Sequence, residues 1–279
     1  MPVRRGQCSM VHCWAMRPRF LLSFVLLAVA GGSIFAQTPV PGNLQLFLLV
    51  GQSNMAGRGT VEAADRVPIP GVFALNKELA WTPAVDPIHF DRPERIGVGM
   101  GRSFALTLLD SNPKAAIGLI PAAMGGSSLA QWSPQGELFA DAVRRAKAAQ
   151  KSGVLRAILW HQGESDSAQE ADARSYRDRW TKMITALRQE LGAADVPVVV
   201  GQLGEFLLPD RPLSGVVNEQ LATIPLTAPV TAFVSSARLV DQGDRIHFNS
   251  ASYRELGRRY ALAFLSLESG WAKSSPKAH

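Results

Sequence analysis

Four polar segments of this 279-residue chain carry side chains that could perform acid–base or nucleophilic chemistry. They are residues 51–59, 122–132, 160–166 and 244–249. The first contains a serine between glycines, and the last contains an aspartate three residues before a histidine. A serine hydroxyl, an imidazole and a carboxylate can together attack a carbonyl group, because the imidazole accepts the serine proton and the carboxylate orients the ring.

Ser53 follows an apolar run, residues 44–50, with only Gly51 and Gln52 between them. A serine in a tight turn between a strand and a helix has its hydroxyl lifted out of the sheet, with free backbone N–H groups beside it. A helix N-cap serine in a glycine-rich turn fits the same residues. A phosphate-binding loop does not, because the Gly-x-x-x-x-Gly-Lys-Ser/Thr spacing is absent.

Asp244 and His247 lie just before the last predicted helix. The aspartate could accept a hydrogen bond from one ring nitrogen and leave the other nitrogen free for a serine. The alternative is a His–Asp pair that only fixes the start of the helix.

The two middle segments offer groups that could bind a ligand. Gly125 and Gly126 would let the backbone approach a substrate oxygen closely, although paired glycines also suit a flexible turn. Trp132 could stack on a sugar ring or fill the core. His161 and Glu164 could ligate a metal, but no second histidine stands nearby at ligand spacing, so we expect no metal.

The elements that must position these segments alternate between strands and helices. Apolar runs of strand length cover residues 44–50, 116–120, 155–160, 196–200 and 230–235. Helical spacing covers 102–109, 138–150, 176–191, 214–224 and 253–265, the last with a predicted Ser252-x-x-Glu255 capping box. This alternation predicts a three-layer α/β/α sandwich around a mainly parallel five-stranded sheet. Residues 57–97 show no clear period and are expected to cross the carboxyl edge of the sheet, where ligands bind in such folds.

The N-terminus has the layout of a secretory signal. Arg17 and Arg19 precede an apolar run over residues 20–30, and small residues lead to Ala36. This run is too short to cross a bilayer as a helix, which disfavours a membrane anchor. We therefore predict an exported protein with a signal peptide (1–36), a linker (37–43), one domain (44–267) and a tail (268–279).

Composition and charge exclude several other classes of protein. Hydrophobic residues make up 47% of the chain and charged residues 19%, which is typical of a globular protein. The formal charge of +6 is misleading, because residues 1–36 hold four arginines and no acid, leaving 25 basic against 23 acidic side chains. No nucleic-acid surface is expected. Both cysteines, Cys8 and Cys13, lie in the predicted leader, so no disulfide is expected.

The motifs GQSNMAGRG, GGSS with the following Trp132, HQGESD and DRIHFN resemble the sequence blocks of the SGNH hydrolase superfamily. The chain is most similar to the branch of sialate O-acetylesterases and the acetylxylan esterases of carbohydrate esterase family 6. The resemblance spans roughly residues 44–265. It implies a flavodoxin-like fold and a serine esterase that removes acetyl groups from a carbohydrate without a cofactor.

The resemblance implies a catalytic role for four residues. Ser53 would be the nucleophile and His247 its base. Either Asp244 or Glu164 would orient the imidazole, and the resemblance does not choose between them.

The resemblance also implies which groups bind the oxyanion and the substrate. The oxyanion would be held by the Ser53 N–H, by Gly126 in preference to Gly125, and by the side chain of Gln162. Substrate contacts are expected from Trp132, Gln52, Asn54 and His161.

Two alternative functions stay open for this sequence. The same scaffold could carry a lipase or thioesterase, although no exposed apolar helix or lid is evident in the sequence. It could also carry a carbohydrate-binding protein without catalysis, although all four polar segments are intact. The acetylated sugar is undetermined, and the near-neutral charge of the predicted mature chain fits an uncharged plant polysaccharide at least as well as an acidic sugar.

Overall fold

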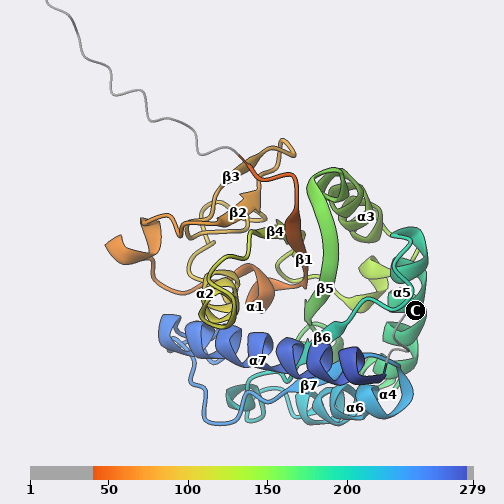
Figure 1. Ribbon diagram of the computed structural model, residues 1–279. Coiled ribbons are helices and arrows are strands. Elements are labelled where there is room, and N and C mark those ends of the chain that lie inside the picture. Colours follow the sequence, from red (N-terminus) through yellow and green to blue (C-terminus); the bar gives the residue numbers. More distant parts are fainter. Residues whose placement is uncertain (1–39, 275–279) are drawn as a thin grey trace, which may run out of the picture. The chain divides into compact units, whose positions relative to one another are not determined.

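A seven-stranded sheet forms the middle layer of the protein, with helices packed on both of its faces (Figure 1). The computed structural model describes residues 40–274, so the predicted signal peptide and the end of the predicted tail lie outside it. The strands are ordered β3-β2-β4-β1-β5-β6-β7, and every neighbouring pair is parallel except β2 and β3. The predicted three-layer α/β/α fold is confirmed.

The strands are β1 (Leu44–Gly51), β2 (Val72–Leu75), β3 (Trp81–Pro83), β4 (Ile117–Pro121), β5 (Gly153–His161), β6 (Val198–Gly201) and β7 (Thr231–Val234). The five predicted runs correspond to β1, β4, β5, β6 and β7. The predicted count of five strands is wrong, because residues 57–97 contribute β2 and β3 to the sheet. β2 has four residues and the edge strand β3 has three, so neither is long enough to show a period of two.

The helices are α1 (Ser53–Ala56), α2 (Gly101–Ser111), α3 (Glu137–Ala149), α4 (Glu170–Arg174), α5 (Tyr176–Glu190), α6 (Leu213–Thr227) and α7 (Ser250–Ser274). Short 3₁₀ turns are η1 (Ala63–Arg66), η2 (Leu129–Trp132), η3 (Gln150–Ser152), η4 (Asp166–Ala168) and η5 (Glu205–Leu207). The five predicted helices correspond to α2, α3, α5, α6 and α7. The predicted capping box of α7 is wrong, because the Asn249 side chain accepts the Ser252 N–H at 2.8 Å while Glu255 pairs with Arg258.

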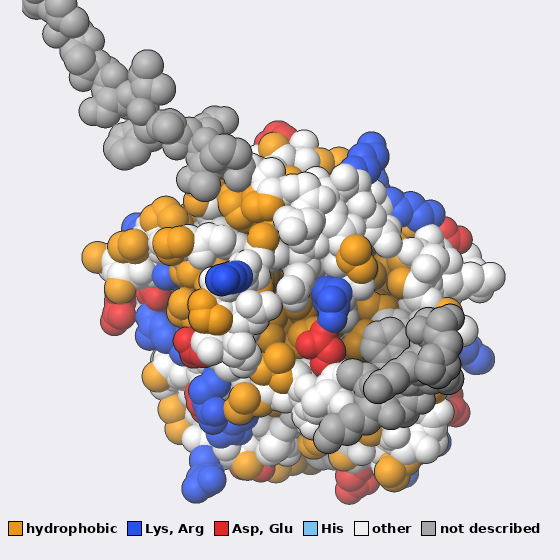
Figure 2. Space-filling model, viewed as in Figure 1, with side chains coloured by type: hydrophobic (Ala, Val, Ile, Leu, Met, Phe, Trp, Pro, Cys, Tyr) orange, Lys and Arg blue, Asp and Glu red, His pale blue; other side chains and the backbone are white. Residues whose placement is uncertain are grey.

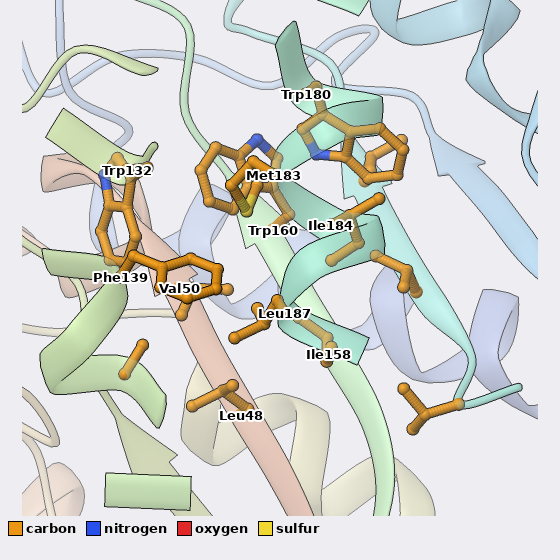
Figure 3. Close-up of a cluster of buried hydrophobic side chains, with 14 of the residues drawn as sticks. Leu48, Val50, Trp132, Phe139, Ile158, Trp160, Trp180, Met183, Ile184 and Leu187 are labelled. Carbon is orange, nitrogen blue, oxygen red and sulfur yellow. The ribbon is translucent and has the colours of Figure 1, made fainter. Parts of the chain in front are cut away.

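One face of the sheet packs against α3, α5 and α6. Leu48 and Val50 of β1 and Ile158 and Trp160 of β5 point into this layer, where they meet side chains of α3, α5 and η2 (Figure 3). All four side chains are fully buried. This packing accounts for the apolar character of the two central strands on this side.

The other face packs against α2 and α7. Along β1 the side chain of Phe47 points to this face, opposite to that of its neighbour Leu48. The Phe47 ring lies edge-on to Phe104 of α2 and Phe264 of α7, with ring centroids 4.9 and 5.2 Å apart. Because β1 is covered on both faces, its sequence is a continuous apolar run and not an alternating one.

The outer surface carries charges of both signs. On the described part of the face in Figure 2, basic and acidic side chains are scattered among apolar and uncharged ones. Among residues 40–274, no helix combines the length and the hydropathy that crossing a membrane requires.

Candidate active site

β1 lies at the point where the order of the strands reverses. The next three strands in the sequence, β2 to β4, lie on one side of β1 in the sheet. The last three, β5 to β7, lie on its other side. In open α/β sheets such a reversal leaves a crevice at the carboxyl ends of the strands, where ligands bind. Ser53 begins α1 two residues after β1 ends, so it stands at this crevice.

Gly51 allows β1 to turn directly into α1. Its φ is +142°, and a Cβ at this position would lie 2.0 Å from the backbone oxygen of His161 on β5. That oxygen cannot move aside, because it accepts the N–H of Gln52 at 3.0 Å. The Gly-Gln-Ser sequence therefore fixes the turn that presents Ser53.

The imidazole of His247 links Ser53 to Asp244. Ser53 Oγ lies 3.0 Å from His247 Nε2, and His247 Nδ1 lies 2.6 Å from Asp244 Oδ2. With the proton on Nδ1, the ring donates to the carboxylate, and Nε2 accepts from the serine hydroxyl. The structure thus brings together a hydroxyl, an imidazole and a carboxylate from the two ends of the domain, an arrangement in which the imidazole could act as a base.

Two aspartates hold the loop that carries His247. Asp241 Oδ2 accepts the N–H of Arg245 at 2.6 Å. Asp244 Oδ1 accepts the N–H groups of Ile246 and His247 at 2.9 and 2.8 Å. Asp244 therefore uses one oxygen to shape the backbone and the other to orient the ring.

Asn54 connects the helix of Ser53 to the loop of His247. Its Nδ2 donates to the backbone oxygen of Ile246 at 3.0 Å, and its Oδ1 accepts the N–H of Phe248 at 3.3 Å. The backbone on both sides of His247 is therefore tied to the residue after Ser53. Asn54 is fully buried and does not line the cavity over Ser53, so the predicted substrate contact is wrong.

Glu164 lines the cavity but does not bond to the His247 ring. Its Oε1 accepts from Asn54 Nδ2 at 2.5 Å, and its Oε2 has no hydrogen-bond partner within the described residues. Burial raises the pKa of Glu164, which favours its neutral form. Of the two carboxylates that the sequence leaves open, Asp244 is the one within hydrogen-bonding distance of the imidazole.

The environment of the pair keeps Asp244 charged and His247 neutral. Partial burial alone would raise the pKa of Asp244, but hydrogen bonds from the His247 backbone and ring outweigh it, so the pKa lies well below its usual range. Burial lowers the pKa of His247 below its usual 6.5. The Asp244 carboxylate opposes this shift, and the nearby charges of Arg58 and Arg95 add to it. At neutral pH the imidazole is therefore ready to accept a proton.

Gly126 and Ser53 present backbone N–H groups that bond to no other group in residues 40–274. Gly126 lines the same cavity as Ser53 and has a φ of +78°, which favours glycine. Gly125 also lines the cavity, but its N–H donates to Asp91 Oδ2 at 2.8 Å. The predicted oxyanion role of Gly125 is therefore wrong, since its only backbone donor is occupied.

Gln162 does not reach the cavity, contrary to its predicted oxyanion role. The side chain is fully buried, and its Nε2 donates to Asp166 Oδ2 at 2.6 Å. The same nitrogen also donates to the Ser127 backbone oxygen and to Gln52 Oε1, at 3.0 and 3.1 Å. These acceptors use both of its hydrogens, so none is left for an oxyanion.

Gln52, and not Gln162, is the glutamine that lines the cavity. Its Oε1 accepts from Gln162 Nε2 and lies 3.4 and 3.3 Å from the N–H groups of Gly163 and Ser165. Because three N–H donors surround Oε1, this oxygen must be the end of the amide that faces them, and Nε2 faces away. Within the described chain, no acceptor forms a hydrogen bond with Gln52 Nε2. Gln52 is therefore a third candidate donor beside Ser53, a role that the sequence analysis missed.

The cavity over Ser53 has a volume of about 250 Å³. Ile246 is the single aliphatic side chain among its described lining residues, and four arginines line it: Arg58, Arg92, Arg95 and Arg211. A larger hollow of about 670 Å³ lies at the opposite edge of the sheet, where β5 and β6 begin, and no serine or histidine is among its lining residues. Ser53 and His247, the residues that the sequence predicts to carry the chemistry, therefore line the smaller cavity.

Two ring-bearing residues predicted to contact substrate lie in the core. Trp132 is 1% exposed, donates from Nε1 to Ser127 Oγ at 2.9 Å, and packs edge-on against Trp160. His161 is fully buried, with its Nδ1 3.0 Å from the Tyr260 hydroxyl. Both substrate-contact predictions are wrong. In the described range, no three His, Cys, Asp or Glu side chains are grouped so as to hold a metal ion.

Contacting Ser, His and Asp side chains at the carboxyl edge of a mainly parallel sheet are the arrangement of a serine hydrolase. Together with the comparisons that follow, they place the protein among the carboxylic ester hydrolases of the SGNH type. Sequence comparison narrows this class. Residues 43–266 match the family described as "Carbohydrate esterase, sialic acid-specific acetylesterase", and the chain belongs to this family.

Two known proteins illustrate the relationship. A probable carbohydrate esterase of Arabidopsis thaliana is 31% identical over 252 residues, which cover 82% of this chain and 93% of the plant protein. The crystal structure of that Arabidopsis protein matches with a TM-score of 0.74, over 80% of this chain and 98% of that one, at 28% identity. The crystal structure of NanS shares the fold with a TM-score of 0.71, over 84% of this chain and all of NanS, at 18% identity.

Proposed function

We propose that the protein hydrolyses O-acetyl esters on carbohydrates through Ser53, His247 and Asp244. The observation that carries the proposal is the 3.0 Å contact between Ser53 Oγ and His247 Nε2, with Asp244 bonded to the far ring nitrogen. Membership of a carbohydrate esterase family supports a sugar ester as the substrate.

In the first half of the reaction, Ser53 Oγ attacks the acetyl carbonyl carbon while its proton passes to His247 Nε2. The tetrahedral intermediate then expels the sugar oxygen, which takes the proton back from His247. Asp244 stabilises the transient imidazolium. In the second half, His247 activates a water molecule that attacks the acetyl-serine, and acetate leaves as Ser53 recovers its proton.

Three donors are available for the negative charge that develops on the acetyl oxygen. They are the backbone N–H groups of Ser53 and Gly126 and the side-chain amide of Gln52. Donors that are in place before the reaction stabilise the oxyanion without further reorganisation, and one of them typically contributes about 3–4 kcal/mol.

The size and polarity of the cavity favour an acetyl group over a long acyl chain. Its volume of about 250 Å³ falls below the roughly 300–1,000 Å³ of pockets that enclose drug-sized ligands. A long chain gains about 0.8 kcal/mol for each buried CH₂ only where the walls are apolar. Here Ile246 is the one aliphatic wall residue in the described part of the chain, which disfavours the lipase and thioesterase alternatives.

Acetate release tests the proposed function directly. We expect the purified protein to release acetate from at least one of acetylxylan, acetylated pectin fragments and O-acetyl sialic acid. It should also cleave 4-nitrophenyl acetate faster than the octanoate by about tenfold or more, because the cavity has no place for the longer chain. Preference for the octanoate would favour the lipase alternative, and absence of turnover on every ester would refute the proposal.

Loss of the Gln52 amide should weaken the oxyanion site. We expect Gln52→Ala to lower kcat by about 10²-fold with little change in KM, because the interaction forms in the transition state. Gln202→Ala serves as the matched control, since Gln202 also holds two loop donors through its Oε1, from Ser235 and Ser236, but does not line the cavity.

Gln52→Glu separates the donor role from a purely structural one. Glutamate keeps an oxygen for the amide of Gln162 and the neighbouring backbone N–H groups, but it offers no N–H to the oxyanion. We expect this variant to lose at least as much kcat as Gln52→Ala. Near wild-type turnover in Gln52→Glu would mean that Gln52 only tethers the loop.

A further inference from the structure

The two adjacent glycines of the cavity differ in what their backbone N–H groups bond to. Within the described residues the Gly126 N–H has no acceptor, whereas the Gly125 N–H donates to Asp91 Oδ2 at 2.8 Å. Asp91 is not among the described residues that line the cavity. We propose that Asp91 is a positioning residue, which fixes Gly125 and thereby aims the N–H of Gly126 at the oxyanion. The inference rests on the proposed ester hydrolysis and adds a residue that acts on it from outside the cavity.

The turn that carries Gly126 uses its other N–H groups to hold its shape. The Met124 N–H donates to the last backbone oxygen of β1 at 3.0 Å, and the Ser127 N–H donates to the Met124 oxygen at 3.2 Å. Asp91 accepts the Gly125 N–H between them. Buried backbone donors normally have an acceptor, so the one N–H of this turn that has none within the described chain is available for a ligand.

A second contact from the same loop fixes the peptide that carries this free N–H. Arg92 Nη2 donates to the Gly125 oxygen at 3.3 Å. The Gly125 oxygen and the Gly126 N–H belong to one planar peptide, so a bond to the oxygen also sets the direction of the N–H. Asp91 holds the peptide before it. Two consecutive residues therefore restrain both peptides that flank the Cα of Gly125.

Arg58 holds Asp91 in place and keeps it charged. Its Nη2 lies 2.7 Å from Asp91 Oδ2, the same oxygen that accepts the Gly125 N–H, and both side chains are almost completely buried. Burial alone would raise the pKa of Asp91, but the hydrogen bond and the charge of Arg58 outweigh it, so the pKa lies below its usual range. Arg58 Nη1 also donates at 2.8 Å to the backbone oxygen of Gly57, directly after α1. A continuous chain of bonds therefore joins the helix of the nucleophile to Gly125.

The close approach of this ion pair accounts for the glycine at position 125. A Cβ on Gly125 would clash with Arg58 Nη2 and would lie 2.8 Å from Asp91 Oδ2. Because both side chains are buried, they have little room to move aside. The first glycine of the turn therefore admits the ion pair, while the second offers its N–H to the oxyanion.

A purely structural role for the ion pair gives a different expectation. Removal of one partner of a buried pair leaves an uncompensated charge and destabilises the fold. Such a loss reduces the amount of folded protein but leaves the kcat of each folded molecule unchanged. A positioning role lowers the kcat of fully folded protein with little change in KM, because the Gly126 N–H bonds to the oxyanion in the transition state.

The test compares Asp91 with Asp65, a buried aspartate of the same segment 57–97. Asp65 Oδ2 likewise accepts one backbone N–H and one arginine, from Glu62 and Arg254, each at 2.9 Å. None of these three residues lines the cavity. Substitutions of Asp65 therefore disturb the same kind of contact away from the proposed chemistry.

Turnover of 4-nitrophenyl acetate is measured at pH 8, where His247 is neutral in every variant, on protein shown to be folded by its circular dichroism. We expect Asp91→Ala to lower kcat by about 10²-fold, a loss typical of a displaced oxyanion donor. Asp91→Asn keeps an oxygen for the Gly125 N–H, so it should stay within about tenfold of the wild type. Asp65→Ala and Asp65→Asn should each retain wild-type kcat, even where the melting temperature falls.

Two double variants test the same acceptor without an unpaired buried charge. Arg58→Met with Asp91→Asn keeps an oxygen for the Gly125 N–H, whereas Arg58→Met with Asp91→Leu does not. Neither leaves a charge behind, so both should fold even if Asp91→Ala does not. Because the arginine is replaced in both, a kcat that is lower by about tenfold or more in the leucine variant reports the acceptor alone.

Binding of trifluoroacetone gives a readout that stability does not affect. Ser53 Oγ adds to its carbonyl carbon, the serine proton passes to His247 Nε2, and the carbonyl electron pair becomes an oxyanion held by the same donors as the reaction intermediate. We expect the inhibition constant to rise in Asp91→Ala by about the factor lost from kcat/KM, and to stay unchanged in Asp65→Ala.

The outcomes separate the positioning role from the esterase activity. Wild-type kcat and wild-type affinity for trifluoroacetone in folded Asp91→Ala would overturn the role of Asp91 and leave the proposed function intact. Equal kcat in the two double variants would overturn it as well, since they differ only at position 91. Absence of wild-type turnover on 4-nitrophenyl acetate and on every acetylated carbohydrate would overturn the proposed function itself.

Discussion

Replacement of Ser53 by alanine should abolish acetate release, with kcat reduced by roughly 10⁵-fold or more. The Oγ atom is the proposed bond-forming group, and no other hydroxyl of the described chain contacts His247 Nε2. Without it, the oxyanion donors can only assist attack by water, which leaves a small residual rate. Acetate release at saturating substrate measures this loss.

A fluorophosphonate probe provides an independent readout of the same residue. It forms a covalent bond with an activated serine, so wild-type protein should take up the label and Ser53→Ala should not. Ser165→Ala is the matched control, because Ser165 lines the same cavity but donates its hydroxyl to the Gly126 backbone oxygen. Labelling that persists in Ser53→Ala and disappears in Ser165→Ala would identify Ser165 as the nucleophile and would contradict the assignment of Ser53.

One property of parallel sheets made two features predictable from the sequence: the layers of the fold, and the convergence of the four polar segments at one edge of the sheet. Parallel strands buried on both faces are continuous apolar runs, and their carboxyl ends all lie on one edge of the sheet. Ser53, Gly126 and Glu164 each follow such a run, so sequence order alone places them near one another. The short strands β2 and β3 carry no comparable signal, because three or four residues cannot establish a period.

The direction of individual side chains could not be predicted, and most errors at the site arise there. Trp160 and His161 end β5 on opposite faces of the sheet, so each enters a core layer and neither points along the strand to its edge. Gln52 and Gln162 are two amides that meet at one hydrogen bond, and only coordinates show which of them keeps a free nitrogen. The guanidinium groups of Arg95 and Arg211 end several bonds from the backbone, so their positions in sequence do not reveal that they share a cavity.

Asp244→Asn should lower kcat by about 10³–10⁴-fold, whereas Glu164→Gln should lower it by about tenfold or less. An asparagine amide no longer favours the ring tautomer that leaves Nε2 free to accept the Ser53 proton, and it cannot stabilise the imidazolium. Glutamine at 164 keeps an oxygen that can accept from Asn54, so the link between the serine helix and the histidine loop is retained. Equal, small losses in both variants would mean that neither carboxylate orients His247.

The pH dependence of kcat/KM distinguishes orientation of the ring from general disturbance of the site. The neutral imidazole is the active form, so activity falls as pH drops through the pKa of His247, which burial holds below 6.5. Asp244 raises that pKa through its hydrogen bond and its charge. Its removal should therefore move the acidic limb of the profile to lower pH, while Glu164→Gln should leave the limb in place. A shift in Glu164→Gln without one in Asp244→Asn would assign the orienting role to Glu164, and it would require the His247 loop to adopt a different position during the reaction.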